Sequence, residues 1–195
     1  MLDEKLLALK LSIEMHGIDI AADTFLLDRL PHLFREDWHL YRQWKRKLAS
    51  LIQVDPRNIS VVGSACTGFS LNPLKNFKNF DGNSDVDVAI VSEHHFSISW
   101  RALRSTNLSA VGDHKMRSAI GDHRSRYIYW GCIAADRILG LLPFKREWTE
   151  AMYAMAGEKP TEEREINFRI YRDYDALRAY HMNGMENLKS KILEN

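Results

Sequence analysis

The chain has 195 residues, of which 45% are hydrophobic and 27% are charged. This composition is ordinary for a globular protein and argues against a disordered chain, a collagen-like repeat and a coiled-coil rod. Because the formal net charge is only +1, any affinity for nucleic acid or a membrane surface must come from local clusters of charge.

Cysteine usage and the N-terminal sequence narrow the class of protein. Cys66 and Cys132 belong to no CxxC motif or Cys/His cluster, so neither a disulfide scaffold nor a structural zinc site is expected. No apolar run approaches the roughly 18 residues that a membrane-spanning helix needs. Residues 1–17 are amphipathic and carry acids, which is unlike a signal peptide. We therefore expect a cytoplasmic protein that does not bind membranes.

In the first half of the chain, two segments have helical periodicity and two are short, apolar and rich in β-branched residues. The first apolar segment ends at the turn-forming pair Gly63-Ser64. The second starts with Asp85-Val86-Asp87 and then becomes fully apolar, which is typical of a central strand. In chain order, we expect helices over residues 2–16 and 35–52, a strand over 59–62, a loop over 70–84 and a strand over 85–91.

The second half ends in the clearest strand pattern of the sequence. Ile166, Phe168 and Ile170 alternate with Asn167 and Arg169, so the two sets point to opposite faces of a sheet. In chain order, we expect a helix near 98–105, loops around Gly112 and Gly121, a mostly buried helix over 123–141, a helix over 146–156, a strand over 165–171 and a helix over 174–193. The pattern as a whole predicts one compact α/β domain wrapped by helices.

Two acidic residues in the second strand are the first sign of a functional site. Asp85 and Asp87 are separated by one residue, so their side chains point to the same face, about 6–7 Å apart along the backbone. Two carboxylates on an otherwise buried strand require a compensating cation. Mg²⁺ or Mn²⁺, which prefer hard oxygen ligands, is the expected cofactor.

The turn after the first strand is a candidate phosphate site. Gly63 allows the backbone to approach a phosphate closely, while Ser64 and the amides around Thr67 and Gly68 can donate hydrogen bonds to its oxygens. A phosphate site beside a two-carboxylate metal site predicts phosphoryl or nucleotidyl transfer.

These features together resemble a known signature. The sequence VVGSACTGFS…NSDVDVAIV, over about residues 59–91, resembles that of the DNA polymerase beta-like nucleotidyltransferase superfamily, in which an apolar strand and Gly-Ser precede Asp-x-Asp. The spacer here is longer, because an Asn/Lys-rich loop is inserted. The resemblance implies an α/β (α+β) fold with a small mixed β-sheet flanked by helices. It implies a single domain over 1–195, divided into a helical N-terminal part (1–56), a catalytic-type core (57–173) and a C-terminal helix (174–195).

The resemblance also implies an activity. Members of the superfamily transfer a nucleoside monophosphate from a nucleoside triphosphate such as ATP to a hydroxyl group and release pyrophosphate. By this resemblance, Asp85 and Asp87 hold Mg²⁺ or Mn²⁺, and Gly63 and Ser64 contact the β- and γ-phosphates.

The superfamily takes a third carboxylate from a later strand, where it activates the acceptor hydroxyl. The segment EINFRIY matches this strand best, but Asn167 stands where the acid is expected, and Glu165 on the same strand face is the alternative. An asparagine is a neutral ligand and a poor general base. Arg169, also on this face, has three interpretations: an ion pair with one of the two aspartates, a contact with the triphosphate, or exposure to solvent.

Two function classes remain open. The segment INFRIYRDYDALRAYHMNGMENL is similar to the tail of bacterial defence-associated nucleotidyltransferases, which implies phage defence or toxin–antitoxin biology and an acceptor hydroxyl on a protein, RNA or nucleotide. The alternative is a binding module for a nucleoside triphosphate or a partner, in which Asn167 has weakened catalysis. An oligonucleotide synthase of antiviral defence is disfavoured, because such enzymes usually carry a longer C-terminal helical domain.

Other polar clusters have simpler explanations beside the functional ones. Residues 94–126 carry six basic residues against two acids, which indicates either a binding surface for RNA, a triphosphate or a partner protein, or a solvated face. The neighbouring His94 and His95 are expected at the surface rather than at a metal. Asp136 is expected to form an ion pair with Arg137 or another neighbour.

Overall fold

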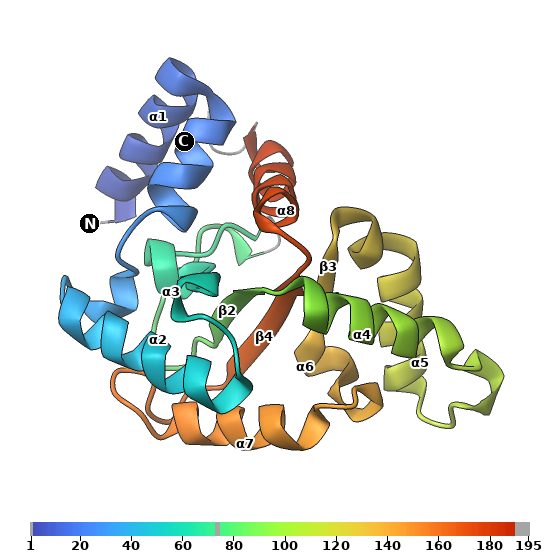
Figure 1. Ribbon diagram of the computed structural model, residues 1–195. Coiled ribbons are helices and arrows are strands. Elements are labelled where there is room, and N and C mark those ends of the chain that lie inside the picture. Colours follow the sequence, from blue (N-terminus) through green and yellow to red (C-terminus); the bar gives the residue numbers. More distant parts are fainter. Residues whose placement is uncertain (1, 73–74, 190–195) are drawn as a thin grey trace.

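A computed structural model describes residues 2–72 and 75–189, which form one sheet surrounded by helices (Figure 1). The helices are α1 (Leu2–Ala22), α2 (Trp38–Ile52), α3 (Ser64–Thr67), α4 (Glu93–Ser105), α5 (His114–Asp122), α6 (Ala135–Ile138), α7 (Lys145–Ala156) and α8 (Tyr174–Glu186). The strands are β1 (Ile59–Val62), β2 (Val86–Val91), β3 (Cys132–Ala134) and β4 (Ile166–Tyr171). The short helical turns are η1 (Asp23–Leu27), η2 (His32–Phe34), η3 (Pro56–Asn58), η5 (Leu108–Ala110), η6 (His123–Tyr127), η7 (Ile128–Trp130) and η8 (Leu139–Leu141).

The four strands form a mixed sheet in the order β1-β2-β4-β3, which confirms the predicted fold class. β1 is antiparallel to β2, β2 is parallel to β4, and β3 is antiparallel to β4. In this register Asp87 lies opposite Val62 on one side and Asn167 on the other. The end of β1 and the starts of β2 and β4 therefore lie at one edge of the sheet.

The two faces of the sheet differ in polarity. Val88 and Phe168 point into the main core, where the sheet packs against helices that include α2, α4 and α7. Asp87, Asn167 and Arg169 point to the other face. Part of that face packs against α8, through a smaller apolar cluster that includes residues of β2, β3 and α8. The polar residues at the strand ends stay partly accessible because this cluster covers only the rest of the face.

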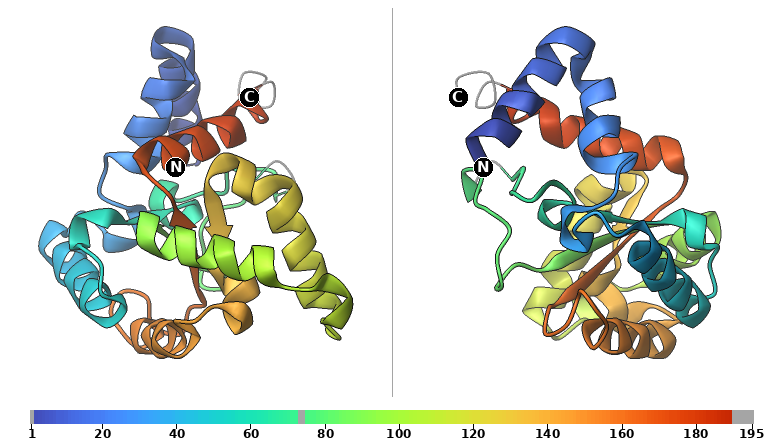
Figure 2. Two further views of the ribbon diagram at one scale, coloured as in Figure 1. Left: turned by 45° about the vertical axis from the view of Figure 1, so that its right-hand side comes forward. Right: turned by 90° about the vertical axis from the view of Figure 1, so that its left-hand side faces the viewer.

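The first and last helices lie side by side at the end of the molecule opposite α2 and α7 (Figures 1 and 2). α1 is interrupted at Gly17, whose φ of 86° is not helical, so the helix folds back on itself. Leu9 and Ile13 pack with Met185 and Leu188, and the loop between β1 and β2 contributes further apolar contacts. Among the described residues, no helix combines the length and apolar character that a membrane span would need.

The predicted helix over 123–141 is wrong. Two short turns, η6 and η7, end at Gly131, whose φ of 61° places it in the left-handed region, and β3 follows at once. Cys132 pairs with Tyr171 of β4, and all three residues of β3 are buried. A three-residue strand buried on both faces has no alternation, so its apolar run is indistinguishable from a buried helix in the sequence.

Other predicted bounds need smaller corrections. Gly121 lies inside α5 rather than in a loop. The helix predicted near 98–105 begins earlier, at Glu93, because the Ser92 hydroxyl caps it by accepting a hydrogen bond from the His95 amide at 3.3 Å. The last helix ends at Glu186, and the end of its predicted range, from residue 190, lies outside the described residues.

Candidate functional site

Most of the residues singled out by the sequence line a single cleft of about 530 Å³ at the edge of the sheet. Gly63 and Ser64 come from the end of β1, Asp85 and Asp87 from the start of β2, and β4 contributes two more polar residues. The rest of the wall includes Leu26, Val62, Ser70, Leu71, Asn72, Lys75, Arg126, Trp130, Asn167, Arg169, Tyr180, His181, Asn183, Gly184, Met185 and Asn187. The predicted Gly-Ser turn and Asp-x-Asp pair are therefore brought together.

Gly63 is required by its backbone angle and by its neighbour. Its φ is 63°, in the left-handed region, and a Cβ atom there would lie 3.0 Å from Asp87 Oδ2. The chain then enters α3 at Ser64, and among the described residues no side chain caps this helix start. A glycine at this position lets the end of β1 pass close to the carboxylate.

Asp85 and Asp87 have different surroundings. The Asn167 side-chain amide donates a hydrogen bond to Asp85 Oδ2 at 2.9 Å. Burial raises the pKa of the Asp87 carboxyl to about 6, and the negative charges of Asp85 and Asp136 act in the same direction. The nearby positive charge of Arg169 opposes this increase without cancelling it. The surroundings of Asp87 thus disfavour the ionised form of its carboxyl.

Arg169 lies beside Asp87, which favours the first of its three interpretations. Its Nε is 3.9 Å from Asp87 Oδ1, and the two side chains are 23% and 27% exposed. One terminal nitrogen donates to the Tyr180 hydroxyl at 3.2 Å, and the guanidinium also lies 6.0 Å from the centre of the Tyr127 ring. Because the same side chain lines the cleft, a contact with a bound triphosphate is compatible with this position.

The other two predicted phosphate-binding residues do not line the cleft. Thr67 is 2% exposed, and its hydroxyl donates to the Phe69 carbonyl and accepts from the Phe69 amide at 3.2 Å. Gly68 has a φ of 87°, and a Cβ atom there would meet Lys5 Nζ and the ring of His32. Both residues therefore shape the chain after α3. Cys66 is fully buried, and burial raises the pKa of its thiol to about 12.

The structure also places the remaining acid candidates. Glu165 is exposed and is not among the residues that line the cleft, so it does not supply a carboxylate there. Asp136 does not form an ion pair with Arg137, whose guanidinium instead donates to Asp122 Oδ2 at 2.7 Å. Asp136 Oδ1 is buried, and among the described residues it has no hydrogen-bond partner.

Several cleft residues lie outside the Gly-Ser, Asp-x-Asp and β4 positions on which the predicted site rests. Lys75 comes from the 70–84 loop, Arg126 and Trp130 from the η6–η7 region, and Tyr180 from α8. The basic run over 94–126 was the available signal for Arg126, but its members have different roles, since Arg124 donates to the Thr106 carbonyl at 2.7 Å. No local pattern indicates that Trp130 or Tyr180 faces the Asp-x-Asp pair.

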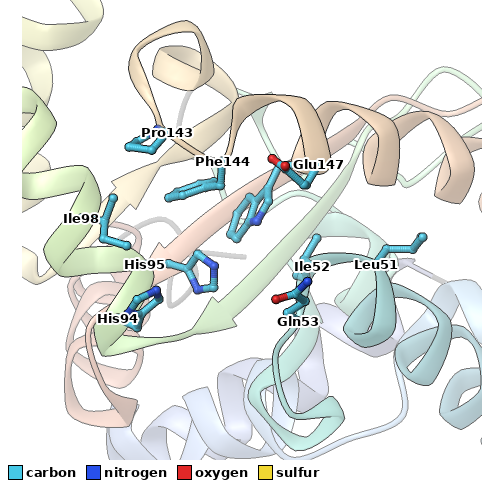
Figure 3. Close-up of a pocket in the computed structure, with 10 residues that line it drawn as sticks. Leu51, Ile52, Gln53, His94, His95, Ile98, Pro143, Phe144 and Glu147 are labelled. Atoms are coloured by element: carbon cyan, nitrogen blue, oxygen red, sulfur yellow. The ribbon is translucent and has the colours of Figure 1, made fainter.

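A second cavity, of about 370 Å³, lies where α4 begins after the other end of β2 (Figure 3). His94 is exposed, as predicted, but His95 is half-buried, with its ring 5.0 Å from Phe144 and 5.1 Å from Trp148. Burial lowers the pKa of His95 to about 4, so the ring is neutral at pH 7. Within residues 2–72 and 75–189, no three His, Cys, Asp or Glu side chains are grouped to hold a metal ion.

The first cleft is thus the stronger candidate, because it joins carboxylates, basic side chains and partly exposed aromatic rings. Comparisons of the chain with protein-family models, curated proteins and solved structures found no match. What the cleft binds is therefore inferred from its own chemistry.

Proposed function

We propose that the protein is a metal-dependent nucleotidyltransferase that transfers a nucleoside monophosphate from a nucleoside triphosphate to a hydroxyl group of a protein, RNA or nucleotide. The observation that carries this proposal is the meeting of Gly63-Ser64 and Asp85-x-Asp87 in one cleft, although twenty residues separate the two motifs. Neighbouring strands bring both to the same edge of the sheet.

The donor set fits Mg²⁺ or Mn²⁺. Asp85 and Asp87 supply hard carboxylate oxygens on one side of the cleft. Mg²⁺ is commonly held by one or two carboxylates, with substrate phosphates and water completing the octahedron. Two carboxylates are therefore enough if the triphosphate binds together with the cation. Once bound, the cation would neutralise charge on the phosphates and polarise the α-phosphorus.

The other cleft residues suit a nucleoside triphosphate. Lys75, Arg126 and Arg169 place three positive charges around the cleft, where phosphate oxygens require them. Trp130 and Tyr180 are partly exposed and offer aromatic faces to a base. Stacking of this kind accepts any base, so we propose a triphosphate site without committing to one nucleotide.

The reaction follows from this placement. The acceptor hydroxyl oxygen forms a bond to the α-phosphorus, and the bond to the oxygen bridging the α- and β-phosphorus breaks, so pyrophosphate leaves with that electron pair. Asn167 cannot take the hydroxyl proton because an amide is not a base near neutral pH. The proton therefore passes to water in the open cleft, and we expect slow turnover.

A second candidate function is a triphosphate-binding module without catalysis, and the Asn167–Asp85 hydrogen bond favours it. An amide that already occupies one carboxylate oxygen stabilises the cation-free cleft. Replacing Asn167 with aspartate separates the two functions: an enzyme should release pyrophosphate faster, whereas a binding module should remain inactive.

The exposed basic residues Arg101 and Arg117 of α4 and α5 are candidate contacts for an anionic acceptor or partner.

Calorimetric titration tests the proposal. ATP, GTP, CTP and UTP are titrated with Mg²⁺ into the wild type and into the Asp85→Asn/Asp87→Asn variant, with His94→Ala at the second cavity as the matched control. We expect cation-dependent binding that the double variant loses and the control retains. The absence of binding by all four nucleotides, or equal binding by wild type and double variant, would refute a nucleotide site in this cleft.

A further inference from the structure

Asp136 is an acidic residue near the cleft that the proposed mechanism does not use. It lies in the first turn of α6, two residues after Ala134, which pairs with Arg169 in the sheet. One of its carboxylate oxygens, Oδ1, is buried, and in the described part of the chain it accepts no hydrogen bond. A buried carboxylate oxygen without a donor is costly, so its retention needs an explanation.

The positive charge of Arg169 acts on both the Asp136 and the Asp87 carboxylates. Its Nε is 3.9 Å from Asp87 Oδ1, beyond hydrogen-bond distance, while a terminal nitrogen is anchored on the Tyr180 hydroxyl. Burial raises the pKa of Asp136, and Arg169 is the positive charge that opposes this increase most strongly. The guanidinium thus interacts with both carboxylates and is hydrogen-bonded to neither.

We propose that Asp136 is a positioning residue that receives the Arg169 guanidinium when a divalent cation occupies Asp85 and Asp87. This inference rests on the proposed function, because it requires that cation. The Arg169 guanidinium lies beside Asp87 and supplies positive charge there, with a smaller contribution from Lys75. A divalent cation at the same carboxylate repels the guanidinium, and the unpaired Asp136 Oδ1 accepts a hydrogen bond from it.

The exchange explains why both residues lie partly buried beside the site. Without Asp136, cation binding would leave Arg169 desolvated and facing a like charge. With Asp136, the guanidinium retains a carboxylate partner in both states. The other charged groups that act on the Asp136 carboxyl are Arg137, which is already paired with Asp122, and the negative Glu165 and Asp87. Arg169 is thus the partner best placed to satisfy it.

A double-mutant cycle in Mn²⁺ affinity, measured by calorimetry without nucleotide, tests the inference. Asp136→Asn is expected to weaken Mn²⁺ binding on the order of tenfold, as expected for loss of a charge-assisted hydrogen bond. In an Arg169→Gln background the same substitution should change the affinity by about twofold at most, because its partner is gone. An equal factor in both backgrounds would mean that Asp136 attracts the cation directly, which overturns the positioning role.

A second arm needs no cation. Asp87→Asn removes the charge beside Arg169, as cation binding would neutralise it, and a crystal structure or the Nε–H resonance of Arg169 reports where the guanidinium lies. We expect it within hydrogen-bond distance of Asp136. If it remains on Tyr180 alone, the exchange is refuted while the proposed function stands. If the wild type binds no Mn²⁺ either alone or together with a nucleoside triphosphate, both the exchange and the metal-dependent function are refuted.

Discussion

Replacement of Asp87 with asparagine is expected to stabilise the folded protein near pH 7.5. Asp87 is partly buried at the cleft, and this burial together with the charge of Asp85 raises its pKa to about 6, despite the opposing charge of Arg169. At pH 7.5 the carboxylate is therefore ionised in surroundings that favour the protonated form. Asparagine has nearly the same shape and no charge, so it removes this cost.

The magnitude follows from the two pKa values of the carboxyl. The ordinary value of 3.8 applies to the unfolded chain and about 6 to the folded protein. Between these values the folded protein binds more protons than the unfolded chain, so the free energy of unfolding falls as the pH rises from about 4 to 6. At 1.36 kcal/mol per pH unit the difference is about 3 kcal/mol. Because the side chain is 27% exposed, solvent screening reduces the expected gain to about 1–3 kcal/mol.

Urea unfolding of the wild type and the Asp87→Asn variant at pH 4.0 and pH 7.5 measures this effect. The variant should be more stable at pH 7.5 and nearly equal to the wild type at pH 4.0, where Asp87 is protonated. Asp28→Asn is the matched control, since Asp28 is exposed and its replacement should change stability by less than about 0.5 kcal/mol at either pH. A variant that is no more stable than wild type at pH 7.5, or that gains equally at both pH values, would refute the reasoning.

Three further substitutions have expected outcomes. Gly63→Ala should cost about 1–3 kcal/mol in urea unfolding, because its φ is 63° and its new Cβ would lie 3.0 Å from Asp87 Oδ2; unchanged stability would contradict the assigned conformation. Arg164→Ala should weaken Mn²⁺ binding, because the Arg164 guanidinium donates to the carbonyls of Asp81 and Ser84 at 2.7 and 2.8 Å and so holds the turn before the Asp-x-Asp pair. The control Arg146→Ala, at an exposed residue, should not change the affinity. Thr161→Val should lower the free energy of unfolding by about 1–3 kcal/mol, because it leaves the buried indole N–H of Trp44 without its acceptor. Thermal unfolding measures this loss.

The part of the site that could be predicted is the part encoded by local patterns. The β-branched run of β1 ends just before Gly63, and the apolar run of β2 begins around Asp87. Both residues are therefore recognisable in the sequence as positions at strand ends. Strict alternation in β4 placed Asn167 and Arg169 on one face, and the structure confirms that Phe168 faces the core. The alternation of apolar and polar residues in a strand depends only on neighbours in the sequence, so it was sufficient to assign these residues to a face of the sheet.

The part that could not be predicted depends on contacts between distant segments. β3 has three residues and is recognisable only from its pairing with β4, and Asp136 is near Arg169 only because of that pairing. Trp130 reaches the cleft because Gly131 turns the chain back toward the sheet in a left-handed conformation. Neither feature leaves a periodic signal. Because residues 123–141 were predicted to form one helix, the sequence could not indicate that Trp130 lines the cleft or that Asp136 lies near Arg169.

The arrangement of charge across the sheet explains how the fold tolerates an ionised, partly buried carboxylate at Asp87. Alternation along β2 assigns every second residue to the main core, where Val88 and Ile90 are fully buried, so stability comes mainly from the face that carries no site residue. The carboxylates are confined to the opposite face and to the end of the strand, where water still reaches them. Loss of the partly buried charge of Asp87 should therefore raise stability without disturbing the core, whereas a polar substitution at Phe168, one residue from Asn167, should unfold the protein.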